Sequence, residues 1–530
     1  MTVAAYASDL TDIFLFESTS GVAAYGGGGS GLGAGVDFAM EGTNAVDKQI
    51  TNTEKGFLFD NVSNFSVGAD DHFFIWIMGA TPGVNDTRNN RGIVACIGDS
   101  ISAFVKFHVD GSDTLPLGGG QVYAIRFINT ALTNFRTLVG TPGSTPSQIG
   151  GGLNTTATVK GANLGVDGAR IGTGYDITGG TGADDPADFA GIASDDESTS
   201  EGVFQTAPGG YTLQGKLRIG SSANACELTD ENALIAIKDT RHSLTDFTEF
   251  LVENAATILT LGNITFLALG TNNPGRFEMI TSAATVILTG CAFQGFGVTV
   301  LGTGAVMTSC QWLASEQIIQ NGAALDACTV DNSLNADAVL ADDLDGITDS
   351  TFVSAGTGHA IAYAPIGAGP FTETLDGNTF TGYAGQGGTA SNRSLLINPA
   401  TSSADITINV QNGATPSYEL AAGYTGTFVI QQTVTVKVTI LDNTGTALQN
   451  SRVLMEADAG GDLSVGTDIL SGLTNASGVL QDTGFNFTNS QPVKGVVRKS
   501  SGSPYFKDGT ITGSIQSSGY DSTIQLVLDE

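Results

Sequence analysis

The chain has 530 residues and a formal net charge of −32, and 41% of its residues are hydrophobic while only 14% are charged. This length predicts three or four domains, and the apolar content is high enough to fill their cores, which excludes a disordered protein. Acidic residues outnumber basic ones by 53 to 21. Because binding to nucleic acids and to anionic membranes depends on Lys and Arg, we expect neither as a partner.

Local sequence signals indicate an all-β protein. Glycine is abundant, with 72 residues, turn-forming clusters recur throughout, and few long segments have helical periodicity. The N-terminus has neither a basic region nor a long apolar core, so we predict no secretory signal and expect synthesis in a cytoplasm. The longest apolar run, residues 73–78, is too short to span a membrane. Five cysteines, an odd number, predict no disulfide framework.

Residues 1–145 are expected to form an N-terminal β-sandwich of the jelly-roll or lectin-like type. Apolar segments there are separated by Gly, Asn and Asp turns, and residues 102–109 alternate at period two like a half-buried strand. The candidate strand 71–77 resembles those of concanavalin-like lectin and laminin-G-like sandwiches. The glycine-rich stretch 25–35 lacks the Lys-Ser/Thr pair of a phosphate-binding P-loop, so we interpret it as a turning loop.

Residues 146–208, rich in Gly, Thr, Asp and Ser, are predicted to be a connector. Two acidic groups lie in this segment, at 184–185 and 195–197, and clustered carboxylates are ligands that suit Ca²⁺. Their spacing does not fit an EF-hand loop. We therefore favour a solvated acidic loop and predict no metal site and no cofactor.

A short frame recurs through the middle of the chain. It consists of a large apolar residue, two small or polar residues, a Cys or its substitute, one further residue, and a second large apolar residue. The first positions lie 27, 19, 18, 22 and 28 residues apart. A fixed core with variable inserts is typical of a solenoid. The six frames cover residues 261–266, 288–293, 307–312, 325–330, 347–352 and 375–380.

The spacing inside the frame predicts a strand, a bend and a second strand. The Cys position and the last apolar position are two apart and face the same way, whereas the first apolar position is out of phase with them. The bend is assigned to Gly290, Ser309, Ala327, Asp349 and Gly377. Stacked coils then form one internal ladder from Ile264, Cys291, Cys310, Cys328, Ser350 and Asn378. Because an open solenoid end exposes unpaired backbone, a cap is expected at the first coil.

This frame resembles the right-handed parallel β-helix of the pectate-lyase-like superfamily, which bacteriophage tailspikes also use. We assign residues 209–400 to the β-helix and residues 401–430 to a transition segment. Residues 431–530 begin with alternating Val434, Val436, Val438 and Ile440, and the turns that follow resemble immunoglobulin-like (Ig-like) carboxypeptidase-regulatory and bacterial Ig-like modules. A C-terminal Ig-like β-sandwich is therefore expected, acting as a spacer, a docking unit or a weak carbohydrate binder.

Carboxylates near the repeats are the candidate catalytic residues, because glycoside hydrolysis needs two of them across a sugar. They are Glu316, Asp342, Asp343 and Asp345. Trp312 would be their stacking platform, but it occupies the ladder position of Phe293 and is interpreted as core. The aspartates precede a coil and also suit a turn. Between 260 and 400 the only basic residues are Arg276 and Arg393, which disfavours the lyase chemistry of pectate lyases.

The combination of a β-sandwich, a β-helix and an Ig-like module in an acidic chain without a leader resembles virion structural proteins of tailed bacteriophages. That resemblance implies a non-enzymatic virion component, a capsid decoration or a tail fibre or spike. Its partners would be other virion proteins and host-surface polysaccharide, and we expect a homotrimer because flat, weakly charged flanks favour symmetric association. The alternative is a tailspike-like polysaccharide depolymerase or a carbohydrate-binding adhesin.

Overall fold

A computed structural model gives the structure of the chain. It describes residues 4–14, 20–25, 32–35, 45–50, 55–59, 62–66, 71–79, 92–108, 121–126, 136–143, 145–154, 162–180, 187–199, 203–207, 209–238, 248–269, 275–386, 392–413, 415–461, 463–487, 490–499, 502–516 and 518–529. The helices and strands of the described residues are almost all β-strands, as predicted, and no helix among these residues is long and apolar enough to cross a membrane. The chain divides into two compact units. Unit 1 comprises residues 1–340 and 353–358, and unit 2 comprises residues 341–352 and 359–530.

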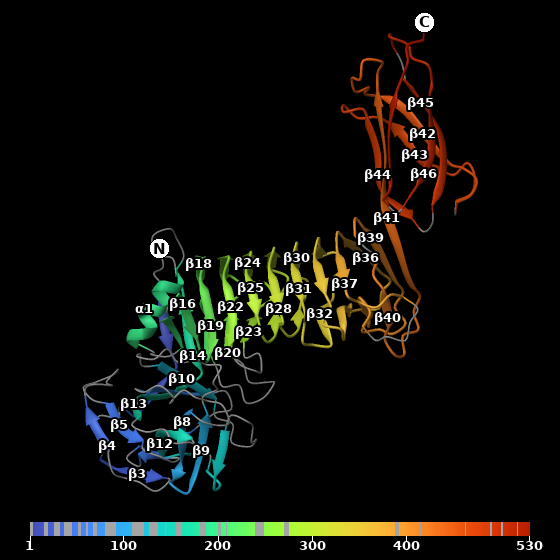
Figure 1. The fold of residues 1–530 in the computed structure, drawn as a ribbon. Coiled ribbons are helices and arrows are strands. Elements are labelled where there is room, and N and C mark those ends of the chain that lie inside the picture. Colours follow the sequence, from blue (N-terminus) through green and yellow to red (C-terminus); the bar gives the residue numbers. More distant parts are fainter. Residues whose placement is uncertain are drawn as a thin grey trace. The chain divides into compact units, whose positions relative to one another are not determined.

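Two six-stranded antiparallel sheets form the N-terminal sandwich of unit 1 (Figure 1). Their strands alternate apolar side chains toward a core that includes Leu58, Cys96 and Phe104. One sheet has the order β10 (Gln121–Arg126), β7 (His72–Gly79), β13 (Ala162–Gly172), β5 (Ala45–Ile50) and β4 (Leu32–Gly35), with β2 (Thr11–Phe14) also on β13. The other has the order β11 (Arg136–Val139), β9 (Ala103–His108), β8 (Gly92–Ser100), β12 (Gln148–Asn154), β6 (Lys55–Phe59) and β3 (Val22–Tyr25).

The predicted connector 146–208 is wrong for its first part, because β12 and β13 are central strands of these sheets. β12 pairs with β6 on one side and with β8 on the other. Its three consecutive glycines, 150–152, read as a loop in the sequence, yet Gly150 and Gly151 are buried. Backbone hydrogen bonds on both edges hold this strand, and they do not require side chains.

The last part of that segment supplies the expected cap of the first coil. The helix α1 (Phe189–Thr199) buries Phe189, whose ring contacts Phe204 and Tyr211 at 5.5 and 5.8 Å between centroids. Asp195, expected in a solvated loop, lies on α1 and accepts a hydrogen bond from the Tyr175 hydroxyl. The edge strand β1 (Ala5–Ser8) pairs antiparallel with the first strand of the solenoid and covers that edge.

Unit 1 contains a parallel β-helix with three strands per coil, which confirms the predicted architecture (Figure 1). Strands of successive coils pair in parallel, as β14 does with β17, β17 with β20, β21 with β24 and β25 with β28. The first sheet contains β14 (Gly174–Thr178), β17 (Lys216–Ile219), β20 (Thr248–Val252), β23 (Gly275–Met279), β26 (Thr299–Val300), β29 (Ile318–Ile319) and β32 (Asp337–Ala341). The second contains β18 (Glu227–Glu231), β21 (Ile258–Gly262), β24 (Thr285–Thr289), β27 (Ala305–Thr308) and β30 (Ala324–Asp326). The third contains β15 (Phe204–Ala207), which is antiparallel, and then β16 (Gly210–Leu213), β19 (Leu234–Lys238), β22 (Thr265–Leu269), β25 (Ala292–Gln294), β28 (Gln311–Leu313) and β31 (Thr329–Asp331).

The internal ladder is formed as the frame predicts. Cys291, Cys310 and Cys328 are buried, and each thiol donates a hydrogen bond to a carbonyl of the coil before it, at 3.6, 3.4 and 3.4 Å. Thiols in this ladder therefore serve as small packed side chains with carbonyl acceptors nearby.

The bend residues adopt the left-handed conformation that the phase change requires. Gly290, Ser309 and Ala327 have φ values of 64°, 55° and 53°. Asn263, at the equivalent position one coil earlier, has φ of 52°. A Cβ atom on Gly290 would lie 2.5 Å from Oδ1 of Asn263, so a larger residue there would displace the Asn263 side chain, and glycine also adopts the positive φ without strain.

In unit 2 the solenoid continues past residue 400, so the predicted transition segment 401–430 is wrong in part. β39 (Ile406–Gln411) pairs in parallel with β36 (Phe371–Asp376) and with β41 (Phe428–Leu441), each time over six residues in register. Inward-facing Ile and Val side chains fill β39 as in other coils, but the longer turns between the strands hide the repeat. The remaining solenoid strands of this unit are β33 (Ile347–Thr348), β34 (Thr351–Val353), β35 (His359–Tyr363), β37 (Thr379–Thr381), β38 (Leu395–Ile397) and β40 (Tyr418–Leu420).

The C-terminal β-sandwich begins within β41. Val434, Val436, Val438 and Ile440 are buried, as their alternation predicts. This part of β41 pairs with β44 (Val479–Phe487) and β47 (Tyr520–Gln525). The opposing sheet has the order β43 (Asp468–Leu473), β42 (Ser451–Ala457), β45 (Gln491–Lys499) and β46 (Gly509–Ile515).

Candidate functional site

Two of the predicted carboxylates lie together in unit 2. Asp343 and Asp345 belong to the loop between β32 and β33, and Glu373 of β36 lies beside them. Carboxylate oxygens of the three residues are within 4.8 Å of one another. Asp342 is in the same loop but outside this group. We call Asp343, Asp345 and Glu373 the acidic cluster.

Glu316, the other predicted carboxylate, is half-buried in unit 1 between β28 and β29. Its pairing with an aspartate of unit 2 would join the two units and stays a prediction. Trp312 is 1% exposed, and its ring stacks on that of Phe293 at 5.2 Å between centroids. Its interpretation as a core residue is confirmed, so it cannot be a platform for a sugar ring.

Hydrogen bonds tie the aspartate loop to β36. The backbone N–H of Leu344, whose side chain is buried, donates to Oε2 of Glu373 at 2.9 Å. The backbone N–H of Thr374 donates to the Asp345 carboxylate. Within the loop, the N–H of Asp345 donates to Oδ1 of Asp343 at 3.0 Å. The carboxylates are thus held in place by backbone donors.

The sequence analysis did not identify Glu373, although its position in the inward–outward alternation of β36 marks it as unusual. Glu373 lies two residues before the buried Leu375 and pairs with Ile408, which is fully buried, so it occupies an inward row of the sheet. An ionisable residue at an inward position is costly unless it has a partner. The partner is Tyr363 of β35, which is itself fully buried and donates from its hydroxyl to Oε1 of Glu373 at 2.7 Å.

This environment raises the pKa of Glu373 above its ordinary value. Burial is the largest cause, and the charges of Asp345 and Asp343 add to it, while the hydrogen bonds from Tyr363 and Leu344 oppose it. Burial and the neighbouring Glu373 also raise the pKa of the Tyr363 hydroxyl, which stays protonated. A carboxyl whose pKa is raised by burial, lying beside two further carboxyl groups, is an arrangement suited to general acid–base chemistry. The same oxygens are of the type that Ca²⁺ and Mg²⁺ prefer.

Replacing Glu373 with Gln should change how stability depends on pH. Because the folded pKa of Glu373 is raised, its stabilising contribution is complete below the unfolded value of about 4.3 and is lost as the pH rises through the folded value. The melting temperature of Glu373→Gln minus that of the wild type should therefore increase when the pH is raised from 4 to 7. Thermal melting followed by circular dichroism measures this. Glu456→Gln on β42 is the control, and an equal gain at both pH values would contradict the assignment.

Burial makes the thiols of Cys310, in the ladder, and of Cys226 poor nucleophiles at neutral pH. The hydrogen bond with the Cys291 thiol lowers the pKa of Cys310, but the Cys328 thiol and burial raise it, to about 12. The Cys226 thiol likewise has its pKa raised by burial, to about 12. Since the thiolate is the reactive and metal-binding form, these protonated thiols act in packing.

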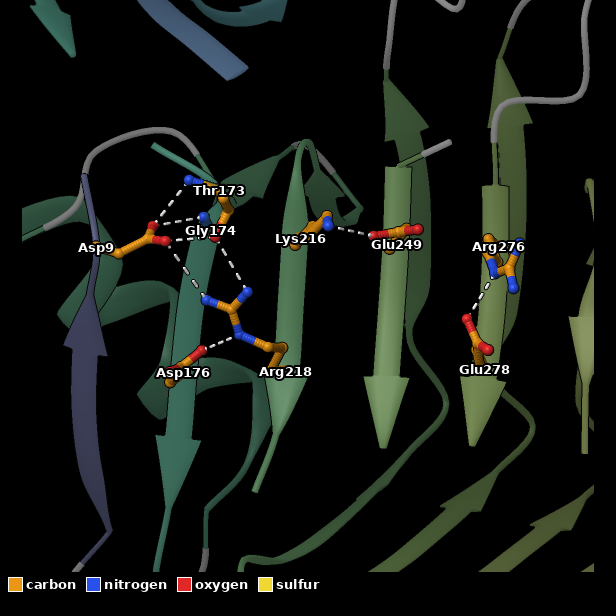
Figure 2. A network of polar contacts seen from close by, with 9 residues as sticks. All are labelled: Asp9, Thr173, Gly174, Asp176, Lys216, Arg218, Glu249, Arg276 and Glu278. Carbon is orange, nitrogen blue, oxygen red and sulfur yellow. Dashed lines mark hydrogen bonds and ion pairs between the residues drawn. The ribbon is translucent and has the colours of Figure 1, made fainter. Parts of the chain in front are cut away.

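A second polar network lies on the first sheet of the solenoid in unit 1 (Figure 2). The Asp9 carboxylate accepts hydrogen bonds from the N–H groups of Thr173 and Gly174 at 2.9 and 2.8 Å. Across the neighbouring strands, Lys216 pairs with Glu249 at 3.1 Å, and on β23 Arg276 pairs with Glu278 at 2.7 Å. Arg276 is thus paired with a carboxylate inside the sheet, and Figure 2 shows its side chain turned toward Glu278.

Comparisons with known proteins leave the family open. No family model matches the chain, and no curated protein matches it. Among solved structures, the chain is similar to the catalytic domain of a GH87 alpha-1,3-glucanase in complex with tetrasaccharides, at 12% identity and a TM-score of 0.21, covering 84% of this chain and 90% of that one.

Proposed function

We propose that the protein is a structural component of a tailed-bacteriophage virion, in which a stiff β-helix holds a C-terminal contact module in a fixed position. The observation that carries this proposal is strand β41. Its residues 428–433 pair with β39 of the solenoid, and its residues 434–441 belong to the sandwich. One strand of 14 residues therefore serves both parts.

A shared strand differs physically from a linker. Flexible linkers let domains swing, whereas a hydrogen-bonded strand keeps the backbone direction across the junction. Such a junction suits a protein that transmits load or presents a surface at a set distance. The net charge of −32 fits this role, because repulsion keeps copies soluble at high local concentration.

The proposal includes assembly as a homotrimer that binds other virion proteins after synthesis in the host cytoplasm. The solenoid flanks give a physical reason. Ile287 and Val306 are adjacent outward residues on β24 and β27, 39% and 43% exposed, with no charged residue between them. Symmetric association would remove such apolar surface from water.

Mass spectrometry of purified virions tests the proposal. Many copies per particle would identify a decoration protein, and few copies would identify a fibre or spike. Absence of the protein from purified particles would contradict the assignment to the virion. Light scattering on the isolated protein tests assembly, and a stable monomer at micromolar concentration would move the symmetry to a partner.

A polysaccharide depolymerase is the second candidate, and the acidic cluster favours it. Glu373 would donate a proton to the glycosidic oxygen, and Asp345 or Asp343 would act as the second carboxylate. Their oxygens lie within 4.8 Å of one another, so the two carboxyl groups are nearer to the short separation of retaining enzymes, roughly 5 Å, than to the longer one of inverting enzymes. The sequence-based alternative uses Glu316 with one of the aspartates.

Clearing of host lawns by the purified protein separates these options. If the acidic cluster is catalytic, Glu373→Gln should abolish the halo, while Glu316→Gln should keep it and melt like the wild type. The reverse pattern would favour the pair with Glu316. A wild-type protein that clears no lawn would argue against the depolymerase and leave the structural role or carbohydrate binding without cleavage.

A further inference from the structure

A polar cavity of about 290 Å³ lies in unit 2 where β41 leaves the solenoid and enters the sandwich. It is outside the acidic cluster and shares no residue with it. The turn after β39 forms one wall, β41 forms the floor, and the turn before β47 forms the other wall. The lining residues are Asn412, Gly413, Gln432, Thr433, Val434, Thr435 and Ser518.

Backbone geometry fixes the walls of this cavity. The register of β41 against β44 shifts between Val434 and Val436, so Thr435 lies in a β-bulge, a feature that re-aims a side chain. A Cβ atom on Gly519 would lie 2.4 Å from the carbonyl oxygen of Thr435, and one on Gly413 would lie 2.5 Å from that of Asn378. Both turns thus approach their neighbours more closely than any side chain allows, and the cavity is largely preformed.

The lining offers hydrogen-bonding groups without charge. Among the lining residues, Asn412 and Gln432 carry amides, and Thr433, Thr435 and Ser518 carry hydroxyls. Two of these groups are oriented by the protein itself. Nδ2 of Asn412 donates to Oδ1 of Asp376 at 2.8 Å, and the hydroxyl of Thr433 donates to the carbonyl of Val410 at 3.3 Å. Val434 is the single apolar lining residue.

Size and chemistry narrow the ligand class. The volume corresponds to roughly ten water molecules at about 30 Å³ each, near the lower limit for small-molecule pockets. Amides and hydroxyls both donate and accept hydrogen bonds, which matches a ring bearing several hydroxyl groups. A charged ligand would lack a counter-charge in the lining, and an apolar one would leave polar groups unpaired.

We propose that this cavity binds one neutral hexose unit of a glycan. This inference rests on the proposed function, because it gives the C-terminal contact module a ligand class. Thr435, aimed by the bulge, and the amides of Asn412 and Gln432 hydrogen-bond the sugar hydroxyls. A site that holds one sugar unit of a polysaccharide binds it weakly. Several copies of the protein binding the same polysaccharide raise the overall affinity.

Saturation-transfer difference NMR on the full chain tests this site with D-glucose, D-galactose, D-mannose and N-acetyl-D-glucosamine as probes. At least one of them should receive saturation, while D-glucuronate should not. Thr435→Val should lower the signal at least fivefold, and Ser518→Trp, which fills the cavity from an exposed turn, should abolish it. Thr439→Val on the same strand is the matched control, and melting temperatures verify that each variant folds.

The two proposals fail independently. Absence of signal from every neutral probe, or a signal that Thr435→Val and Ser518→Trp leave unchanged, would overturn the hexose site. Virions that contain the protein would still support the structural role in that case. Sugar binding by a protein absent from virions would keep the site and overturn the virion assignment.

Discussion

Cys310→Asp is expected to unfold the solenoid of unit 1. Cys310 is fully buried, and its sulfur lies 3.4 Å from the carbonyl oxygen of Leu288 and 3.6 Å from that of Thr308. A carboxylate at this position would face two acceptors and no cation. Burying an unpaired charge costs about 3–5 kcal/mol, a large part of the total stability of a folded domain. Thermal unfolding followed by circular dichroism should show a much lower melting temperature or no transition.

Cys310→Ser is the matched control, because the ladder already contains a serine. In unit 2 the hydroxyl of Ser350 donates to the carbonyl of Thr348 at 2.9 Å. A serine at 310 can likewise donate to a backbone carbonyl, so its cost should stay near 1 kcal/mol. Wild-type melting of Cys310→Asp would show that residue 310 faces outward and that the ladder is misassigned.

Trp312→Ala should produce the second large loss of stability. Its ring ends a stack that runs from Phe266 through Phe293, with centroids 5.0 and 5.2 Å apart. Removing a buried aromatic side chain of this size costs about 3–5 kcal/mol, because the rigid stack cannot close the cavity. The hydroxyl of Thr299, which accepts a hydrogen bond from Nε1 at 3.1 Å, would also lose its donor. Urea denaturation gives the free energy of unfolding.

Trp312→Phe separates packing from the hydrogen bond. Phenylalanine occupies the equivalent position in the preceding coil, so the stack should persist and the cost should fall to about 1–2 kcal/mol. A loss for Trp312→Ala no greater than that for Trp312→Phe would show that the ring contributes little to the core.

The sequence by itself determined the repeat, because its signals are local. Each coil places apolar residues at inward positions two apart, and each bend places a small or turn-forming residue, which takes the left-handed conformation at Gly290 and Ala327. These rules hold within six residues, so spacing alone reveals the ladder. The alternation from Val434 to Ile440 is equally local, and it identified the start of the sandwich.

Tertiary structure decided what depends on pairing between distant segments. Gly150 and Gly151 have no side chain to mark a strand, and only their hydrogen-bonded neighbours β6 and β8 make β12 one. Asp345 and Glu373 are separated along the chain by a full coil and its insert. They meet because stacking aligns their coils, and insert length, which varies from coil to coil, conceals that alignment in the sequence. The cavity around Thr435 has the same origin, because its walls are brought together only by the close approach of two turns to backbone that is remote in sequence.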